Sequence, residues 1–369
     1  MKEAEFGWKT TDTPSILAFN NDVPNPIQQV IIQTINAHYP ITAPYTLKSL
    51  EATTDSPIGR YKLSQQATLV GHHSTSEIIR SEKPINKREN QLIKKDNEVF
   101  VRVTSKIGLP VLEQEITQYL VDADISINPI IISGIESMWH DTHLRLDIRP
   151  LVTGAHFNYS VDEFRSLCLT LHDCHQALKD FPLKEAIKAQ AKSRFSKMSH
   201  YFESIIPKLA EVHAELFPEH HTWAENNIDC FQRMTAEFNP NFHLVDDAQC
   251  LHGEIHLGNV IFNDKQAILI DFEEAVYTFA SPTWDIAYLL QRFCYDALED
   301  SHQQDQFLAI ASEIFTFELL AVHKMMQQLA WFSLATLLYQ RHINDTRAPL
   351  SEYQKFVRLE AQARELMGQ

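Results

Sequence analysis

The 369-residue sequence lacks three features that would place it in a common class at once. No apolar run approaches the roughly 20 residues that a membrane span needs, so we expect no membrane association. The five cysteines are scattered and have no CxxC spacing, which argues against a disulfide framework and for a reducing compartment. Basic residues are scarce, because 32 Lys and Arg stand against 48 Asp and Glu, giving a formal charge of −16. Nucleic acid is therefore not an expected partner, whereas an acidic cleft would concentrate a cationic small molecule.

What the sequence does contain is typical of a globular protein, with 44% hydrophobic and 22% charged residues. Its length is sufficient for two lobes. The first ten residues carry charges and no apolar stretch follows them, so we expect no secretory signal and a cytoplasmic location.

The first 150 residues predict a mostly antiparallel sheet with one helix. Residues 1–60 give no clear assignment and are expected to be an N-terminal extension of unknown role. A hairpin is expected next, with strands Ala67–Val70 and Glu77–Arg80 around the turn Gly71–Ser76. An exposed charged loop, Ser81–Asn97, follows it. The remaining expected elements are the strands Glu98–Val103, Pro129–Ile132 and Leu144–Ile148 and the helix Leu112–Ala123.

The pattern changes to long helices after a boundary near Pro150–Ala155. The expected helices are Asp162–Leu178, Lys184–Leu209 and Trp223–Phe238, and helices dominate again after Trp284. Two short apolar strands, Val260–Phe262 and Ala267–Ile270, lie between them. The chain should therefore have an α+β fold, with a small β-rich N-lobe over residues 61–153 and a larger helical C-lobe over residues 154–369.

The segment Leu251–Leu290 contains the residues most typical of catalysis. Asn259 precedes the first short strand, and Asp271 follows the second. Since the polar turn Asn263–Gln266 joins these strands as a hairpin, both side chains should lie at the same end of it. Carboxylate and amide oxygens suit Mg²⁺ coordination.

This segment resembles the catalytic segment of the aminoglycoside phosphotransferase/choline kinase family, relatives of the protein kinases. The matching residues are His252-Gly253, His256, Gly258-Asn259, Ile270-Asp271-Phe272 and Asp285-Ile286-Ala287. The resemblance implies a protein-kinase-like two-lobed fold, Mg²⁺ held by Asn259 and Asp271, ATP or alternatively GTP as co-substrate, and Asp285 bracing the catalytic loop.

The catalytic base would be Glu254, where the family has Asp. Glu keeps the carboxylate and adds one methylene, and a positioned base is sensitive to such a displacement. The substitution leaves open a slower enzyme, a shifted acceptor geometry or a catalytically silent relative. Because phosphoryl transfer depends mainly on positioning and electrostatic stabilisation, we expect activity to survive.

The resemblance also implies a nucleotide site in the N-lobe. Arg102 would contact the α/β-phosphates, with Glu113 as its partner on the next helix and Glu115 as a weaker candidate. Ser74, Thr75 and Ser76 would lie in the loop that covers the nucleotide. Arg149 and Leu151 belong to the segment Ile148–Gly154, which resembles the hinge that binds the base through backbone groups.

Other hypotheses explain fewer of these residues. His252 and His256 have the spacing of a zinc site, but the glycines at positions 253 and 258 disfavour the continuous helix that a zincin motif requires. A protein kinase is disfavoured because no activation-loop segment separates Asp271 from Asp285.

We therefore predict an enzyme that transfers the γ-phosphate to a hydroxyl of a small molecule, with a cationic amino sugar or amino alcohol among the candidate acceptors. The alternative is a nucleotide-binding sensor or scaffold without catalysis. A monomer and a homodimer both remain open.

Overall fold

The computed structural model describes residues 45–52, 59–65, 98–104, 109–204, 220–239, 241–243, 245–344 and 348–369, together with residues 31, 33 and 35. The chain forms two compact units. Unit 1 contains the residues up to Gln114 and Ile130–Leu151, and unit 2 contains Glu115–Pro129 and Val152–Gln369. Each unit has its own set of candidate functional residues.

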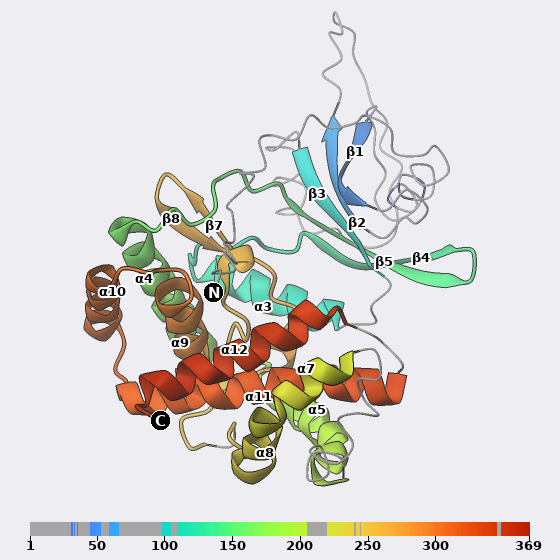
Figure 1. Cartoon of the computed structure of the whole chain (residues 1–369). Coiled ribbons are helices and arrows are strands. Elements are labelled where there is room, and N and C mark those ends of the chain that lie inside the picture. The colour runs from blue at the N-terminus through green and yellow to red at the C-terminus, as the bar shows by residue number, and fades with distance from the viewer. Residues whose placement is uncertain are drawn as a thin grey trace, which may run out of the picture. The chain divides into compact units, whose positions relative to one another are not determined.

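Unit 1 is built on a five-stranded antiparallel sheet with the order β1-β2-β3-β5-β4 (Figure 1). The strands are β1 (Tyr45–Ala52), β2 (Gly59–Gln65), β3 (Glu98–Thr104), β4 (Ile132–Trp139) and β5 (Thr142–Pro150). The register places Arg102 of β3 directly opposite Asp147 of β5. Directly opposed residues of antiparallel strands have side chains on the same face, so these two residues share one face of the sheet.

The sheet begins earlier than the sequence suggested, because β1 lies wholly before residue 60. A register shift between Ser49 and Glu51 interrupts the alternation of polar and apolar residues in β1, which hides the strand from pattern analysis. The expected hairpin around Gly71–Ser76 and the loop Ser81–Asn97 lie outside the described residues, and Ser74, Thr75 and Ser76 lie outside them too.

The other N-terminal elements confirm the expected classes, with one displacement. The helix α3 (Pro110–Asp122) and the strand β3 lie where the sequence predicted them. The strand expected at Pro129–Ile132 instead starts at Ile132 and continues to Trp139. Pro129 has no N–H for a strand ladder, and the register shift between Ile132 and Ile135 obscures the pattern that follows.

Unit 2 is mostly helical (Figure 1). Its helices are α4 (Val161–Lys179), α5 (Lys184–Ser204), α7 (His221–Asn226), α8 (Ile228–Glu237), α9 (Thr283–Leu289), α10 (Ser301–Ile314), α11 (Leu319–Asn344) and α12 (Leu350–Leu366). The helix α9 continues into a π-helical turn, η5 (Leu290–Tyr295). The aromatic rings of Phe164 and Phe307 stack with centroids 4.2 Å apart and join α4 to α10.

The expected single helix Trp223–Phe238 is wrong, because the chain breaks at Asn227 into α7 and α8. The Asn227 side-chain Nδ2 donates to the carbonyl oxygen of Trp223 at 2.8 Å. Asparagine commonly competes with the helical backbone in this way, which favours a helix end over a helix interior.

Short strands between the helices position the segment that contains Glu254, Asn259 and Asp271. The strands β7 (Val260–Asn263) and β8 (Gln266–Leu269) pair as the predicted hairpin, and β6 (Gln249–Cys250) pairs with β9 (Phe279–Ala280). Asp264 and Lys265 in the hairpin turn both have positive φ, 47° and 68°, which is typical of a type I′ turn.

All five cysteines are free thiols buried in unit 2: Cys168, Cys174, Cys230, Cys250 and Cys294. Among the described residues, no single helix has the length and apolar composition of a membrane span; α10 and residues 319–341 of α11 meet that test only as a pair, with a bend of 104° between them.

Candidate active site

The hairpin β7–β8 brings Asn259 and Asp271 to the same end. Asn259 ends a short 3₁₀ turn, η3 (Leu257–Asn259), immediately before β7, and Asp271 follows shortly after β8. The Ile270 N–H donates to the Asn259 carbonyl oxygen at 3.0 Å, which joins the two segments beside both side chains.

The Asn259 side chain is buried and fixed by the loop before it. Its Nδ2 donates to the Glu254 carbonyl oxygen at 2.9 Å. Since the amide nitrogen is used in this bond, the group available to a cation is the side-chain oxygen Oδ1. Oxygen ligands are those that Mg²⁺ prefers.

Asp271 has φ of 62°, in the left-handed region that a residue with a Cβ rarely adopts. The next residue, Phe272, is fully buried and its ring lies against the His252 ring, with centroids 4.5 Å apart. The backbone conformation of Asp271 is strained, and the residue after it is anchored in the core by its ring. Strain of this kind is concentrated at functional sites.

Within the described parts of the chain, no three His, Cys, Asp or Glu side chains are grouped as a metal site. Asn259 and Asp271 would supply two protein ligands. This number fits Mg²⁺, which usually takes one or two carboxylates from the protein and completes its shell with water and substrate phosphates.

Asp285 holds the loop that carries Glu254. Its Oδ1 accepts from the Gly253 N–H at 2.9 Å, and its Oδ2 accepts from the His252 N–H at 3.0 Å. The neighbouring Trp284 Nε1 donates to the Gly253 carbonyl oxygen at 2.9 Å. The start of α9 therefore satisfies both backbone groups of Gly253.

His252 is a structural part of this loop. Burial lowers the pKa of its imidazole, so the ring is neutral at pH 7. Its Nε2 lies 3.0 Å from the Ile270 carbonyl oxygen and its Nδ1 lies 3.4 Å from the Glu254 N–H. The ring must therefore donate through Nε2 and accept at Nδ1, and it links the loop of Glu254 to the residue that follows β8.

Gly253 occupies a position that only glycine fits. Its φ is 91°, and a Cβ built there would lie 2.5 Å from Thr278 Oγ1 and 3.0 Å from Thr278 Cβ. The glycine lets the chain turn between His252 and Glu254 close to Thr278.

Glu254 extends from the loop with 43% of its side chain exposed. Burial of the remainder, and then the carboxylates of Glu274, Asp271 and Glu273, raise its pKa to about 7. A general base works best when its pKa is near the operating pH. The His256 Nε2 lies 3.9 Å from Glu254 Oε1, but burial and the charge of Arg292 lower the pKa of His256 to about 4. The two groups consequently form no ion pair at neutral pH.

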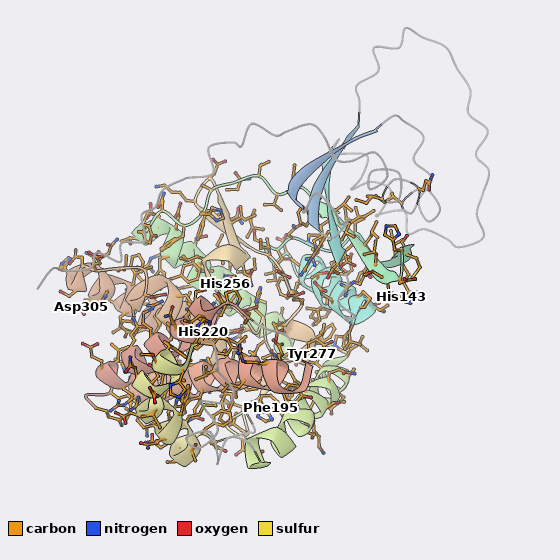
Figure 2. All side chains as sticks on the ribbon, turned by 45° about the vertical axis from the view of Figure 1, so that its right-hand side comes forward. His143, Phe195, His220, His256, Tyr277 and Asp305 are labelled. Atoms are coloured by element: carbon orange, nitrogen blue, oxygen red, sulfur yellow. The ribbon has the colours of Figure 1, made fainter. Side chains whose placement is uncertain are left out.

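Glu274 is held by a residue of α5. It forms an ion pair with Arg194, whose guanidinium lies 5.8 Å from the Tyr277 ring centroid and 5.4 Å from that of Phe332. Figure 2 labels Tyr277 and His256 among the side chains of unit 2. The ion pair between Arg194 and Glu274 joins the segment after Asp271 to α5.

Unit 1 contains a second set of charged residues on one face of its sheet. The Glu113 carboxylate on α3 binds Arg149 Nη2 at 2.6 Å and Arg145 Nη2 at 3.3 Å. Arg145 also binds Asp147 at 2.6 Å, and Asp147 accepts from the Gly134 N–H at 3.0 Å. Arg149, Glu113 and Asp147 are buried.

These contacts give Glu113 two arginine partners that the sequence did not indicate. The signal that could have revealed them is a period of two along β5, at Arg145, Asp147 and Arg149. Residues two apart on a strand lie on the same face, so the sequence could have predicted three charged side chains on one face of the sheet. Arg102 shares that face with Asp147, while its pairing with Glu113 stays a prediction. Arg149 was expected to act through its backbone; its side chain forms the ion pair with Glu113. Leu151 is half-buried at the end of unit 1.

A model of the phosphotransferase enzyme family matches residues 145–323, which include the whole segment from His252 to Asp285. No curated protein matches the chain.

Three solved structures resemble the chain along most of its length. A spectinomycin phosphotransferase in complex with ADP and spectinomycin is 14% identical, with 92% of this chain and 98% of that chain covered and a TM-score of 0.55. An amicoumacin kinase in complex with AMP-PNP and Ca²⁺ is 12% identical, with coverages of 86% and 88% and a TM-score of 0.51. Choline kinase from Streptococcus pneumoniae is 13% identical, with coverages of 91% and 99% and a TM-score of 0.50. At these identities the likeness concerns the fold, and it confirms the expected kinase-like α+β architecture.

Proposed function

With the resemblance to the aminoglycoside phosphotransferase/choline kinase family confirmed by the match over residues 145–323, we propose that this chain transfers the γ-phosphate of ATP to a hydroxyl group of a small molecule. The family match and the kinase-like structural neighbours agree on the enzyme class, a phosphotransferase with a small-molecule hydroxyl acceptor.

Asn259 and Asp271 are the proposed Mg²⁺ ligands. When bound, Mg²⁺ would neutralise charge on the β- and γ-phosphates. The observation that supports this role is the geometry of the hairpin end. Asp271 lies in a strained backbone conformation beside Phe272, and the Asn259 amide is oriented by its bond to the Glu254 carbonyl oxygen.

Glu254 is the proposed general base. Its carboxylate would accept the proton of the acceptor hydroxyl as the hydroxyl oxygen attacks the γ-phosphorus and ADP leaves. A pKa of about 7 suits this role, because near neutral pH the group is sufficiently ionised to accept the proton. The bonds from Asp285 to His252 and Gly253 hold the loop that presents this carboxylate.

In unit 1, Arg102 is the proposed contact for the nucleotide phosphates, and the segment that includes Arg149 and Leu151 is proposed to bind the base. Glu113, Arg145 and Arg149 would act by fixing α3 on the sheet face that carries Arg102. GTP is the alternative nucleotide.

The acceptor is proposed to carry an amine as well as its hydroxyl. Glu273 and Glu274 follow the metal-binding candidate Asp271, and both act on the pKa of Glu254, so a cationic group near the base would relieve the repulsion among these carboxylates. The formal charge of −16 favours the approach of such a molecule.

The test is nucleotide consumption with Mg²⁺ across a panel of hydroxylated amines and sugars, comparing wild type with Asp271→Asn, Glu254→Gln and Glu254→Asp. We expect acceptor-dependent turnover that both Asp271→Asn and Glu254→Gln reduce by at least about a hundredfold, while Glu254→Asp retains part of it. Glu313→Gln, at an exposed ion pair with Arg165, is the matched control.

Mg²⁺-dependent nucleotide binding without turnover on any acceptor would favour a sensor or scaffold. Turnover that survives unchanged in Asp271→Asn would show that the proposed metal ligand is wrong.

A further inference from the structure

The helix that braces the catalytic loop also carries a tyrosine and an arginine toward it. Tyr288 and Arg292 follow Asp285 at helical spacing, and residues three and four apart share one face of a helix. Asp285 binds the backbone immediately before Glu254, so α9 starts at the loop that carries the proposed base. Arg292 lies in the π-helical turn, a feature that often occurs at functional sites.

Arg292 is a largely buried cation with a weak partner. Its side chain is 12% exposed, and its ion pair with Asp296 is long, at 3.8 Å between Nη1 and Oδ2. Asp296 in turn forms a closer ion pair with Arg358, whose Nη2 also donates to Oδ2 at 3.4 Å. One carboxylate is thus shared by two guanidinium groups. A buried charge needs better compensation than this to offset its desolvation.

Arg292 and Tyr288 both interact electrostatically with Glu254, the proposed base. Burial lowers the pKa of Arg292, and the groups that act on it next are Tyr288, Asp296, Arg358 and Glu254, with no candidate metal ligand among them. Burial, followed by the Glu254 charge, raises the pKa of Tyr288 to about 12, which keeps its hydroxyl neutral as a hydrogen-bond donor.

A second cation comes from the last helix. Lys355 on α12 acts on the pKa of both Glu254 and His256, and its Nζ lies 2.9 Å from Glu352. Its side chain is half-buried, with 37% exposed. Glu254 is therefore influenced by carboxylates from the segment after β8 and by cations from η5 and α12.

We propose that Arg292, assisted by Lys355, is an anion-binding subsite for the acceptor, and that the acceptor is a zwitterion that carries a carboxylate in addition to its hydroxyl and amine. The proposal rests on the proposed function. The carboxylate binds the Arg292 guanidinium, the amine lies toward Glu273 and toward Glu274, which also holds Arg194, and the hydroxyl lies at Glu254. A planar guanidinium suits a carboxylate because it can donate two parallel hydrogen bonds.

The test uses pairs of compounds of which one member carries a carboxylate: serine against ethanolamine, which differ by the carboxylate alone, and carnitine against choline, which differ by a carboxymethyl group. Their affinities for the full chain are measured by calorimetry without nucleotide, in wild type and in Arg292→Gln, Arg292→Lys, Lys355→Gln and the surface control Arg165→Gln. We expect wild type to bind the carboxylate-bearing member of a pair about tenfold more tightly. Arg292→Gln should abolish this preference, Lys355→Gln should reduce it, and Arg165→Gln should leave it unchanged.

Arg292→Lys controls for loss of binding through misfolding. It keeps the positive charge and should retain part of the preference for the carboxylate-bearing compound. Equal affinities within each pair, or no binding of any of the four compounds, would overturn the proposal. So would a preference that is the same in Arg292→Gln and wild type.

Turnover separates this inference from the function on which it rests. If choline and ethanolamine are phosphorylated as well as carnitine and serine, and the acceptor KM is unchanged in Arg292→Gln, the kinase function stands and the subsite is wrong. If no acceptor is phosphorylated but binding depends on the carboxylate and on Arg292, the subsite stands and the kinase function fails.

Discussion

The Nε2 atom of His175 on α4 lies 2.9 Å from Oδ2 of Asp285, a residue that follows 110 positions later at the start of α9. Both side chains are buried. Asp285 also accepts the N–H groups of His252 and Gly253, so the imidazole is the third donor to one buried carboxylate. The catalytic loop is therefore held from α9, and α9 is held from α4.

Replacing His175 by leucine should weaken both the fold and catalysis. The buried Asp285 carboxylate would lose one donor, at a cost of about 2 kcal/mol in the free energy of unfolding. The loosened loop should lower kcat with little change in the KM for nucleotide. Urea unfolding and steady-state kinetics measure the two effects. His172→Gln is the control, because this half-buried histidine lies one turn before His175 on α4 and its described contacts are to Asp173, Gln176 and the Phe315 ring. Equal effects of the two substitutions would contradict the role given to His175.

The ion pair between Glu113 and Arg149 should be important for the stability of unit 1. Their side chains are 3% and 4% exposed. Glu113→Gln would remove the carboxylate that Arg149 binds, whereas Arg145 would keep Asp147 as a partner. Breaking a buried pair on one side typically costs about 3–5 kcal/mol. Glu313→Gln removes one partner of an exposed pair and should change stability by less than about 1 kcal/mol. Measurement of the free energy of unfolding of both variants under the same conditions tests this difference. Similar values would mean that the buried network contributes little to stability.

Glu254→Gln should stabilise the metal-free protein at alkaline pH while removing activity. The folded-state pKa of Glu254, about 7, is above its ordinary value of 4.5. The stability that the protonated carboxyl group allows is therefore fully present below pH 4.5, and the free energy of unfolding falls as the pH rises through 7. At pH 8 the variant should be more stable than wild type by about 1 kcal/mol, a figure reduced for the exposure of the side chain to solvent.

Unfolding in EDTA at pH 5 and at pH 8 measures this difference. The gap between Glu254→Gln and wild type should widen with pH. A constant gap would show that the carboxylate ionises normally in the folded protein.

Gly253→Ala should be more damaging than a substitution at another glycine with positive φ. Gly368 has φ of 72°, and a Cβ there would have no atom within 4 Å, whereas a Cβ at Gly253 would clash with Thr278. The backbone strain is common to both variants and costs about 1 kcal/mol; the clash is specific to Gly253. Thermal unfolding and kcat of the two variants should therefore differ strongly, and equal losses would show that backbone strain alone decides the outcome.

The sequence predicted the parts of the molecule whose contacts are local. The hairpin that carries Asn259 and Asp271 has a polar turn between two apolar strands, and α3 and α4 have helical spacing of apolar residues. Both patterns reflect interactions within a few residues, which is why they can be read before the structure is known.

The sequence did not predict the contacts that join distant segments. His175 and Asp285 belong to different helices, and no periodicity marks one as the partner of the other. Glu113 binds Arg149 from 36 positions away, and a charged residue on a strand is more often at the surface. The break at Asn227 depends on a single side-chain bond to Trp223 within an otherwise helical pattern.

The burial of the cysteines has a consequence for the chemical reactivity of the chain. Burial raises the pKa of each thiol, so the nucleophilic thiolate is scarce as long as unit 2 is folded. Oxidants and alkylating reagents should then reach these sulfurs only when the unit opens. Since unit 1 has no cysteine, the rate at which thiols are labelled measures the opening of unit 2 alone.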